Sequence, residues 1–330
     1  MKKVRSVGIA GLGKSLPKRV LTNFDLEGMV DTSDDWIQTR TGIRERRIAD
    51  KKTAASDLAA AAAQEALKDA KLKPEDVDLI IVATVTPDML SPATSCLVQA
   101  KIGAVNAACF DLNAACPGFI YALVVAQQFI ATGRYNNALV IGAEVLSKFV
   151  DWKDRSTCVL FGDGAGAAVL RPVKSGGIIS IYLGTDGTLA ELLYIPAGGS
   201  RTPPSHKTID ERLHYLKMKG KEVFKNAVRS MESSARRAVS EAGLEIKDID
   251  MLVPHQANLR IINATTEKLG IDPKKVFVNL DKYGNMSSAS TIVALYEAFK
   301  QRRIKRGDYI LMVAFGAGLA WGACVIKWNK

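Results

Sequence analysis

The chain has 330 residues, of which 48% are apolar and 24% charged, and its formal net charge is +11. This is the composition of a globular protein long enough for one large or two medium domains. Its five cysteines are odd in number and show no Cys-x-x-Cys spacing, which argues against a disulfide framework or a zinc knuckle. No apolar run approaches the ~20 residues that span a bilayer.

The chain starts with Met1-Lys2-Lys3, and Gly11, Gly13 and Lys14 interrupt the apolar stretch that follows before it could form the core of a signal peptide. We therefore expect a cytoplasmic protein. The charge is uneven, because residues 1–172 carry 21 Lys and Arg against 19 Asp and Glu, whereas residues 173–330 carry 24 against 15. A basic second half favours an anionic partner, and a phosphate-bearing ligand or an acidic protein fits at least as well as nucleic acid.

The first predicted element is a strand over residues 4–10, followed by a glycine-rich turn at residues 11–13. Residues 8–15 also match the phosphate-binding pattern G-x-x-x-x-G-K-S. A phosphate-binding loop must lead directly into a helix, but Pro17 and the pair Lys18-Arg19 interrupt that continuation. We therefore predict a strand and a turn here, and no nucleotide site.

Two capped helix starts follow, at Thr22 or Asn23 and at Ser33. Beside Trp36 lies a cluster of guanidinium groups, from Arg40, Arg44, Arg46 and Arg47. Such a cluster is most often a solvated basic loop. An aromatic ring near several guanidinium groups is also what a nucleotide-bearing ligand needs, with stacking for the base and positive charge for the phosphates.

The next segments alternate between the two kinds of secondary structure and then recur. A helix is predicted over residues 53–71, and strands over residues 77–84, 107–113 and 137–142. The pattern of residues 65–82 returns 172 positions later at 237–253, and the same offset pairs residues 122–123 with 294–295. We therefore predict an α/β fold of two duplicated halves, residues 1–173 and 174–330, with a site between them.

Cys116 follows an apolar strand and directly precedes a predicted helix, whose first turn suits Pro117. Phe119, Ala122, Leu123, Ala126 and Ile130 form one apolar face of that helix. A helix N-terminus favours a thiolate and lowers the pKa of a thiol, so Cys116 is a candidate nucleophile. It is equally compatible with an inert buried cysteine.

A nucleophilic cysteine needs a base or a hydrogen-bonding partner, and the chain has three histidines. His206 and His214 lie in a polar segment that predicts a loop and a surface helix. His255 stands at the end of the predicted strand 251–253, where α/β enzymes place their chemistry. We therefore select His255 as the candidate partner.

Asn285 occupies the position that corresponds to Asn113 under the offset of 172 residues, so it precedes a helix as Asn113 precedes the Cys116 helix. On its own, Gly-Asn is an ordinary turn sequence. The small-residue turn at residues 315–319 lets backbone N–H groups approach an oxyanion closely. Cys, His and Asn in this order also describe papain-type proteases, but no Cys-Gly-Ser-Cys-Trp run surrounds Cys116.

The chain resembles β-ketoacyl-[acyl carrier protein] synthase III, a condensing enzyme of the thiolase superfamily that initiates type II fatty acid synthesis. The resemblance covers nearly the whole chain. It rests on Thr-Arg-Thr-Gly-Ile-Arg-Glu-Arg within residues 33–47, on Cys116 and its flanks, on Phe-Gly-Asp-Gly-Ala-Gly-Ala at 161–167, on His-Gln-Ala-Asn-Leu-Arg at 255–260 and on Tyr-Gly-Asn at 283–285.

The resemblance implies a thiolase-like body with layers in the order α/β/α/β/α and an acyltransferase activity. Cys116 would take an acyl group from acyl-CoA, and malonyl-acyl carrier protein would then lose CO2 and attack the acyl-enzyme. His255 and Asn285 would donate hydrogen bonds to the enolate, so neither a metal nor any cofactor beyond the CoA substrate is needed. The backbone N–H groups of Cys116 and Ala317 would form the oxyanion hole.

The resemblance also assigns binding residues and partners. Trp36, Arg40 and Arg155 align with residues that hold CoA, and Arg260 aligns with a residue near the tunnel mouth that receives the acidic carrier protein. Lys268 is the second candidate for carrier-protein binding. A homodimer is expected, with no nucleic acid or membrane as a partner. Ser91 aligns with a residue, often Phe, that reaches across the dimer to close the acyl pocket, so we expect acyl primers longer than acetyl to be accepted.

Pro117 and Glu267 depart from the family pattern. Pro117 follows the cysteine where small residues are familiar, and Glu267 stands where some relatives carry a lysine of the docking surface. Two other functions are alternatives. A thiolase-superfamily sibling, such as a polyketide starter synthase or an acyltransferase with another acceptor, would use the same Cys, His and Asn, whereas a module that binds carrier protein without catalysis would keep the basic surface but show no acylation of Cys116.

Overall fold

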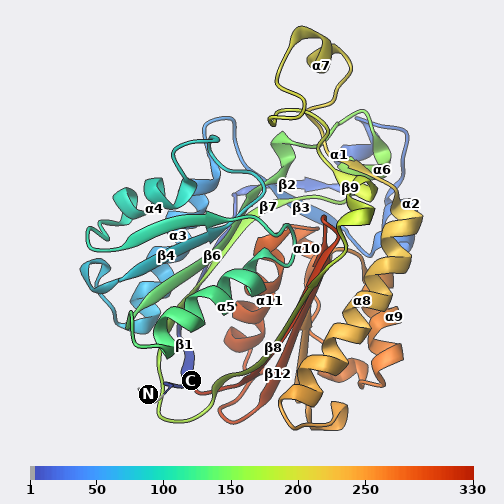
Figure 1. Cartoon of the computed structure of the whole chain (residues 1–330). Coiled ribbons are helices and arrows are strands. Elements are labelled where there is room, and N and C mark those ends of the chain that lie inside the picture. Colours follow the sequence, from blue (N-terminus) through green and yellow to red (C-terminus); the bar gives the residue numbers. More distant parts are fainter. Residues whose placement is uncertain (1–3) are drawn as a thin grey trace.

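Two β-sheets with the same strand pattern form the centre of the computed structural model, which describes residues 4–330 (Figure 1). The first sheet has the order β1-β7-β6-β4-β5, built from β1 (Val7–Ser15), β7 (Asp163–Pro172), β6 (Ala138–Val145), β4 (Leu79–Ala83) and β5 (Ala108–Leu112). The second has the order β8-β13-β12-β11, built from β8 (Gly177–Thr185), β13 (Ala320–Lys327), β12 (Tyr309–Gly316) and β11 (Met251–Pro254).

The strand directions repeat as well as the order. In each sheet the first two pairings are antiparallel and the next is parallel. In the first sheet, β5 pairs in parallel with the outer side of β4. In the second sheet, the corresponding parallel pairing on β11 is reduced to a single bridge between Leu252 and Val276. The duplicated α/β architecture predicted from the offset of 172 residues is confirmed.

Helices separate and cover the sheets, giving five layers (Figure 1). α5 (Gly118–Ala131) and α11 (Ser288–Lys300) lie between the two sheets, where they contact strands of both. α3 (Ala55–Ala70) and α4 (Thr94–Ile102) cover the outer face of the first sheet. α8 (Gly220–Glu241) covers the outer face of the second, and α9 (Leu259–Leu269) packs on α8.

Shorter elements connect these layers. They are β2 (Arg19–Thr22), α1 (Asn23–Glu27), α2 (Asp34–Thr41), β3 (Glu45–Ile48), η1 (Pro74–Asp76), η2 (Leu146–Lys148), α6 (Arg155–Cys158), η3 (Gly187–Leu192), β9 (Leu193–Tyr194), α7 (His206–Asp210), β10 (Lys217–Met218), η4 (Ile246–Asp248), η5 (Pro273–Lys275) and α10 (Leu280–Tyr283). Thr22 and Ser33 cap α1 and α2, as predicted.

The central helix α5 is apolar because both of its neighbours are sheets. All five residues of its predicted face, from Phe119 to Ile130, are fully buried. Its partner α11 is buried along most of its length for the same reason. Cys116 and Asn285 come just before the first residues of α5 and α11, so the starts of these two helices position the site.

The predicted turn at residues 11–13 is wrong, because strand β1 continues through these residues to Ser15. A Cβ on Gly11 would lie 2.3 Å from the carbonyl oxygen of Ala66, and one on Gly13 would lie 2.2 Å from that of Ala62. Both glycines therefore let helix α3 approach strand β1 closely, and close approach of another backbone is a common reason for a glycine within a strand. No helix follows β1, so the phosphate-binding reading fails.

Among residues 4–330, no helix combines the length and the apolar character that crossing a membrane requires.

Candidate active site

Cys116 lies at the junction of both halves, two residues before α5. Pro117 is the N-cap of the helix, and Ala115 has a positive φ of 48°. A Cβ on Gly316, at the end of β12, would lie 2.8 Å from the Cβ of Cys116 and 3.0 Å from its Sγ. The second half therefore touches the cysteine through a glycine, and a larger residue has no room there.

His255 follows β11, as predicted, and is only 3% exposed. Its backbone N–H donates to the carbonyl of Val313 at 2.8 Å, which fixes the strand end. Neither ring nitrogen has a hydrogen-bond partner within residues 4–330. Burial lowers the pKa of His255 to about 3, so the imidazole is neutral and offers one donor and one acceptor to a ligand.

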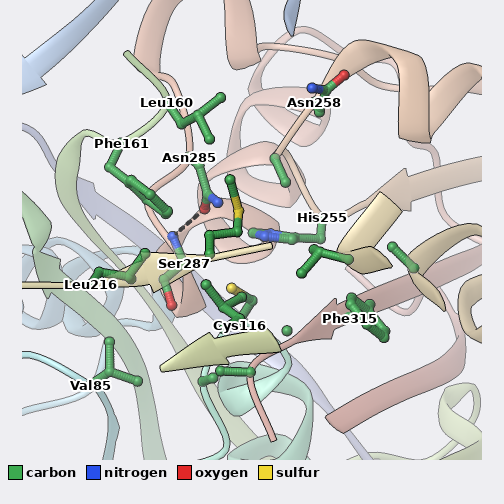
Figure 2. A pocket seen from close by; sticks show the side chains of 18 of the residues that line it. Val85, Cys116, Leu160, Phe161, Leu216, His255, Asn258, Asn285, Ser287 and Phe315 are labelled. Atoms are coloured by element: carbon green, nitrogen blue, oxygen red, sulfur yellow. Dashed lines mark hydrogen bonds between the residues drawn. The ribbon is translucent and has the colours of Figure 1, made fainter. Parts of the chain in front are cut away.

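Asn285 precedes α11 and pairs with Phe161, so that the Gly162 N–H donates to the Asn285 carbonyl at 3.0 Å. Its side-chain Oδ1 accepts a hydrogen bond from the Ser287 N–H at 2.8 Å (Figure 2). The corresponding Oδ1 of Asn113 accepts from Ala115 N–H at 3.2 Å. Because Oδ1 is occupied, the Nδ2 group of Asn285 is the part of the amide that remains to donate to a ligand.

These three residues line one cavity of about 800 Å³ (Figure 2). Its walls are mostly apolar, with contributions from both halves of the chain. Ala317 also lines it, just after Gly316. Neither the N–H of Cys116 nor that of Ala317 donates to a backbone oxygen within the described part of the chain. The cavity thus joins a thiol, an imidazole, an amide and two backbone donors, the set that acyl-transfer chemistry requires.

The pKa of Cys116 differs from the sequence expectation. Burial raises the pKa of the thiol to about 12, and the Glu144 carboxyl acts in the same direction only while it is ionised. The predicted lowering is wrong, because the apolar walls that surround the sulfur disfavour its charged form more than the start of the helix favours it. Cys116 therefore begins as a thiol and must lose its proton to a base as it attacks.

Trp36, Arg40 and Arg155 come together where the cavity meets the surface. Trp36 and Arg40 line the cavity from α2, and the guanidinium of Arg155 lies 5.3 Å from the Trp36 ring. Arg155 also donates to the carbonyl of Asp31 at 2.8 Å. Its guanidinium is also 3.2 Å from the Asp31 carboxylate, so Arg155 forms an ion pair there. The arrangement offers an aromatic face and two exposed guanidinium groups, of which that of Arg155 is paired with Asp31, to an anionic ligand.

Arg46, another arginine of the predicted cluster, lies in a different environment from Arg40. Arg46 is fully buried and donates to the carbonyls of Leu21 and Val159 and to Oδ1 of Asn23. Burial lowers its pKa to about 10. Arg46 therefore ties β3 to the segments beside the cavity, and the interpretation as a solvated loop is wrong for it.

Arg260 and Lys268 lie at opposite ends of α9, and both are exposed. The guanidinium of Arg260 lies 5.5 Å from the ring of Phe224, which lines the cavity. Lys268 is in the last turn of the helix and does not reach the cavity lining. Arg260 is thus the one of the pair that neighbours the opening.

Ser91 is exposed and does not line the cavity of a single chain. It adjoins Leu90, which is 88% exposed, and lies in the loop that connects β4 to α4. His206 is exposed as predicted, whereas His214 is half-buried and bonds Thr208 Oγ1 at 2.9 Å.

Sequence reasoning missed several residues of the site. One wall comes from β9, from the segment before α8 and from the first turns of α8, including Leu193, Leu216, Val223 and Phe224. Ser287 and the fully buried Glu144 were also missed. Ser287 lies in the run Tyr-Gly-Asn-Met-Ser-Ser, and this motif was the one signal that could have pointed to it.

Within residues 4–330, no group of three or more His, Cys, Asp or Glu side chains is arranged to hold a metal ion.

Comparison with known proteins decides the family. Two family models match, 3-oxoacyl-[acyl-carrier-protein] synthase III over residues 110–187 and its C-terminal counterpart over residues 239–328. The β-ketoacyl-[acyl-carrier-protein] synthase III of Caldanaerobacter subterraneus is 61% identical over 98% of both chains. The chain belongs to the 3-oxoacyl-[acyl-carrier-protein] synthase III family.

Solved structures of the family agree with the fold. The synthase III of Aquifex aeolicus is 52% identical, with a TM-score of 0.91 over 98% of this chain and 100% of that one. A priming β-ketosynthase of a polyketide pathway is 35% identical, with a TM-score of 0.93 over 100% of this chain and 98% of that one. The predicted thiolase-like fold is confirmed, and membership of this family leaves no support for the papain-type reading.

Proposed function

We propose that this protein catalyses the decarboxylating condensation of an acyl-CoA primer with malonyl-acyl carrier protein, the step that initiates type II fatty acid synthesis. The product is 3-oxoacyl-acyl carrier protein. The observation that carries the proposal is the meeting of Cys116, His255 and Asn285 in one cavity of a synthase III chain. The C. subterraneus relative and others at 50–61% identity carry the synthase III name, whereas the polyketide priming synthase is more distant at 35%.

The first half of the reaction transfers the acyl group. The neutral imidazole of His255 accepts the Cys116 proton, the sulfur attacks the thioester carbon, and the bond from that carbon to the CoA sulfur breaks. The proton then passes to the departing CoA thiolate. The N–H groups of Cys116 and Ala317 stabilise the negative oxygen of the tetrahedral intermediate.

The second half forms the carbon–carbon bond. Malonyl-acyl carrier protein loses CO2, and the electrons of that bond produce an enolate on the thioester oxygen. His255 and Asn285 Nδ2 donate hydrogen bonds to this oxygen, and the enolate carbon attacks the acyl-Cys116 carbonyl. The bond from that carbonyl carbon to the Cys116 sulfur then breaks, which releases 3-oxoacyl-acyl carrier protein, and the Cys116 thiolate takes up a proton from water. Hydrogen-bond donors supply the stabilisation, so we propose that the reaction uses no metal and no cofactor besides the CoA substrate.

We assign CoA recognition to Trp36, Arg40 and Arg155, because a stacking surface and positive charge suit an adenine and its phosphates. Arg260 and Lys268 are proposed to receive the acidic carrier protein. The role of Arg260 is supported by its position beside the cavity-lining Phe224. The net positive charge of the second half of the chain supports the roles of Arg260 and Lys268 alike.

We further propose a cytoplasmic homodimer of chains that each consist of two halves, residues 1–173 and 174–330. The first sheet ends at residue 172 and β8 begins at residue 177, which suits that boundary. β5 is an edge strand, and Leu90 beside Ser91 is almost fully exposed. An unpaired strand edge with exposed apolar residues nearby is suited to a second copy.

Ser91 is the proposed gate of the acyl pocket, contributed by the partner chain. Because serine is smaller than phenylalanine, primers longer than acetyl should be accepted. A chain-length series of acyl-CoAs with wild type and Ser91→Phe tests this, and labelling of Cys116 by acetyl-CoA alone in the wild type contradicts it.

The function is tested by the intact mass of wild type and Cys116→Ser after exposure to a panel of acyl-CoAs, followed by CO2 release from malonyl-acyl carrier protein. We expect an acyl adduct only in the wild type, and CO2 release that depends on it. An adduct without CO2 release indicates an acyltransferase with another acceptor. No adduct with any primer leaves only a carrier-binding module.

A further inference from the structure

Ser287 is a buried hydroxyl in the cavity wall for which the chemistry above gives no role. It is 2% exposed, it lines the cavity together with Cys116, and Figure 2 shows both side chains in the same part of the site. Its Oγ has no hydrogen-bond partner within residues 4–330. A buried hydroxyl without a partner costs free energy, so its presence in the wall of a reactive cavity points to a ligand or a reacting atom as its partner.

The backbone of Ser287 is held in an unfavourable conformation that aims this side chain. Its φ is 44° and its ψ is −121°, a region that glycine adopts far more readily than serine. The Asn285 Oδ1 holds the Ser287 N–H, and helix α11 begins at the next residue. The conformation is therefore fixed from both sides, and a side chain is kept at a position where glycine would avoid the strain.

The neighbouring hydroxyl cannot take the same role. Ser288 Oγ lies 2.8 Å from the carbonyl oxygen of Ala83 and 2.9 Å from Oε1 of Glu144, so both of its contacts are made within the protein. Glu144 is in turn held by Thr86 Oγ1 at 2.7 Å and by the Val85 N–H at 3.1 Å. Of the two serines, only Ser287 has a hydroxyl left to serve the cavity.

We infer that Ser287 is a further catalytic residue, whose hydroxyl donates a hydrogen bond to the Cys116 sulfur as the thiol loses its proton. The Cys116 S–H bond breaks, the proton moves to the acceptor nitrogen of His255, and the new thiolate receives the Ser287 O–H. This inference rests on the proposed function, because it takes Cys116 as the nucleophile. Ser287 also lowers the pKa of Cys116, in opposition to burial.

The charged and titratable groups around the thiol come from two elements besides its own. Glu144 lies on β6 and disfavours the thiolate only while it is ionised, and His255 faces the cavity from the end of β11 and is neutral. Neither group supplies a positive charge to stabilise a thiolate in the free enzyme. A neutral donor such as Ser287 is therefore the side chain available for that purpose.

The test measures alkylation of Cys116 by iodoacetamide at several pH values, in wild type, Ser287→Ala and Ser287→Gly. Both variants lose the hydroxyl, but glycine relieves the backbone strain and alanine keeps it. We expect both to alkylate Cys116 roughly threefold to tenfold more slowly at one pH, because a hydrogen bond to a charged group is lost while the remaining thiolate becomes more nucleophilic.

Thr291→Ala is the matched control, because Thr291 carries a buried hydroxyl that has no partner among residues 4–330, one turn further along and outside the cavity. It should alkylate at the wild-type rate. The inference is overturned if both Ser287 variants alkylate at the wild-type rate. It is also overturned if Ser287→Ala is slow while Ser287→Gly alkylates at the wild-type rate, because that result reports backbone strain alone. Iodoacetamide needs no acyl-CoA, so failure of acyl transfer in the wild type is a separate result that overturns the proposed function instead.

Discussion

Gly316 and Cys116 meet across the two halves of the chain with no space between them. A Cβ on Gly316 would lie 2.8 Å from both the N and the Cβ of Cys116. Backbone atoms cannot move aside as the end of a flexible side chain can, so the absence of a side chain at residue 316 fixes where the sulfur lies. The turn that contains Ala317 is brought against the nucleophile by the same contact.

Gly316→Ala should therefore displace the cysteine. We expect the rate of Cys116 acylation to fall by about 100-fold, since a displacement of ~1 Å can have that effect. The free energy of unfolding should fall by about 1–3 kcal/mol through overpacking. Gly187→Ala is the control, because its Cβ would meet nothing within 4 Å. Equal acylation rates in the two variants would show that the contact does not position Cys116.

Asn285→Asp should separate the two halves of the reaction. An aspartate oxygen can still accept the Ser287 N–H, as Asn285 Oδ1 does at 2.8 Å, but its second oxygen cannot donate to an enolate. We expect CO2 release from malonyl-acyl carrier protein to fall by at least about 100-fold. Acylation of Cys116, measured by intact mass, should fall much less. A parallel loss in both steps would instead indicate that Asn285 only supports the loop.

Alkylation of Cys116 should depend on pH as expected for a thiol of raised pKa. Burial raises the pKa of Cys116 to about 12, so the thiolate fraction grows about tenfold per pH unit throughout the range in which the protein can be assayed. The iodoacetamide rate constant should therefore keep rising to about pH 10. A plateau near the ordinary cysteine pKa would mean that the helix start outweighs burial after all.

Glu144→Gln tests whether the buried carboxyl is protonated. The single proton of the Ser288 hydroxyl cannot serve both Ala83 and Glu144, and the Ala83 carbonyl can only accept. When the Ser288 hydroxyl donates to the Ala83 carbonyl, the proton in the contact between Ser288 Oγ and Glu144 Oε1 must come from the Glu144 carboxyl. Burial raises the pKa of Glu144 above its ordinary value of 4.5, which agrees with a protonated carboxyl.

A raised pKa in the folded state means that the carboxyl stabilises the fold fully below the unfolded pKa and loses that stability as pH rises toward the folded pKa. Glutamine does not titrate. The Tm of wild type minus that of Glu144→Gln should therefore decrease as the pH rises above the ordinary carboxyl pKa. A difference that is constant, or that grows in favour of the wild type, would indicate an ionised carboxylate.

Trp36→Ala should weaken recognition of CoA specifically. The ring lies 5.3 Å from the Arg155 guanidinium and lines the cavity, so its loss removes both a stacking surface and a support for that charge. We expect the KM for acyl-CoA to rise about tenfold, with the KM for malonyl-acyl carrier protein almost unchanged. A similar rise for both substrates would place Trp36 in the general structure of the opening.

The sequence was sufficient to predict elements whose signals are local or repeated. The helix after Cys116 and the strand before His255 have apolar patterns that any packing of the chain must bury. The offset of 172 residues relates Asn113 to Asn285, and in the structure both accept the N–H two residues on. Duplication thus let the sequence predict that distant residues share a site.

The burial of single groups could not be predicted in this way. Arg46 belongs to a run of arginines, yet it is fully enclosed because three carbonyl and amide oxygens surround its guanidinium. Gly11 and Gly13 suggested a turn, because a sequence does not show that helix α3 passes over that strand.

By itself, the sequence determined the type of chemistry: it carries the cysteine, histidine and asparagine and the strand and helix ends that bear them, because these depend on residue identity and short-range pattern. Only the tertiary structure decided the state of those groups. The thiol is neutral, the ring nitrogens of His255 have no partner within residues 4–330, and Ser287 is directed into the cavity, since each depends on what the other half of the chain packs against it.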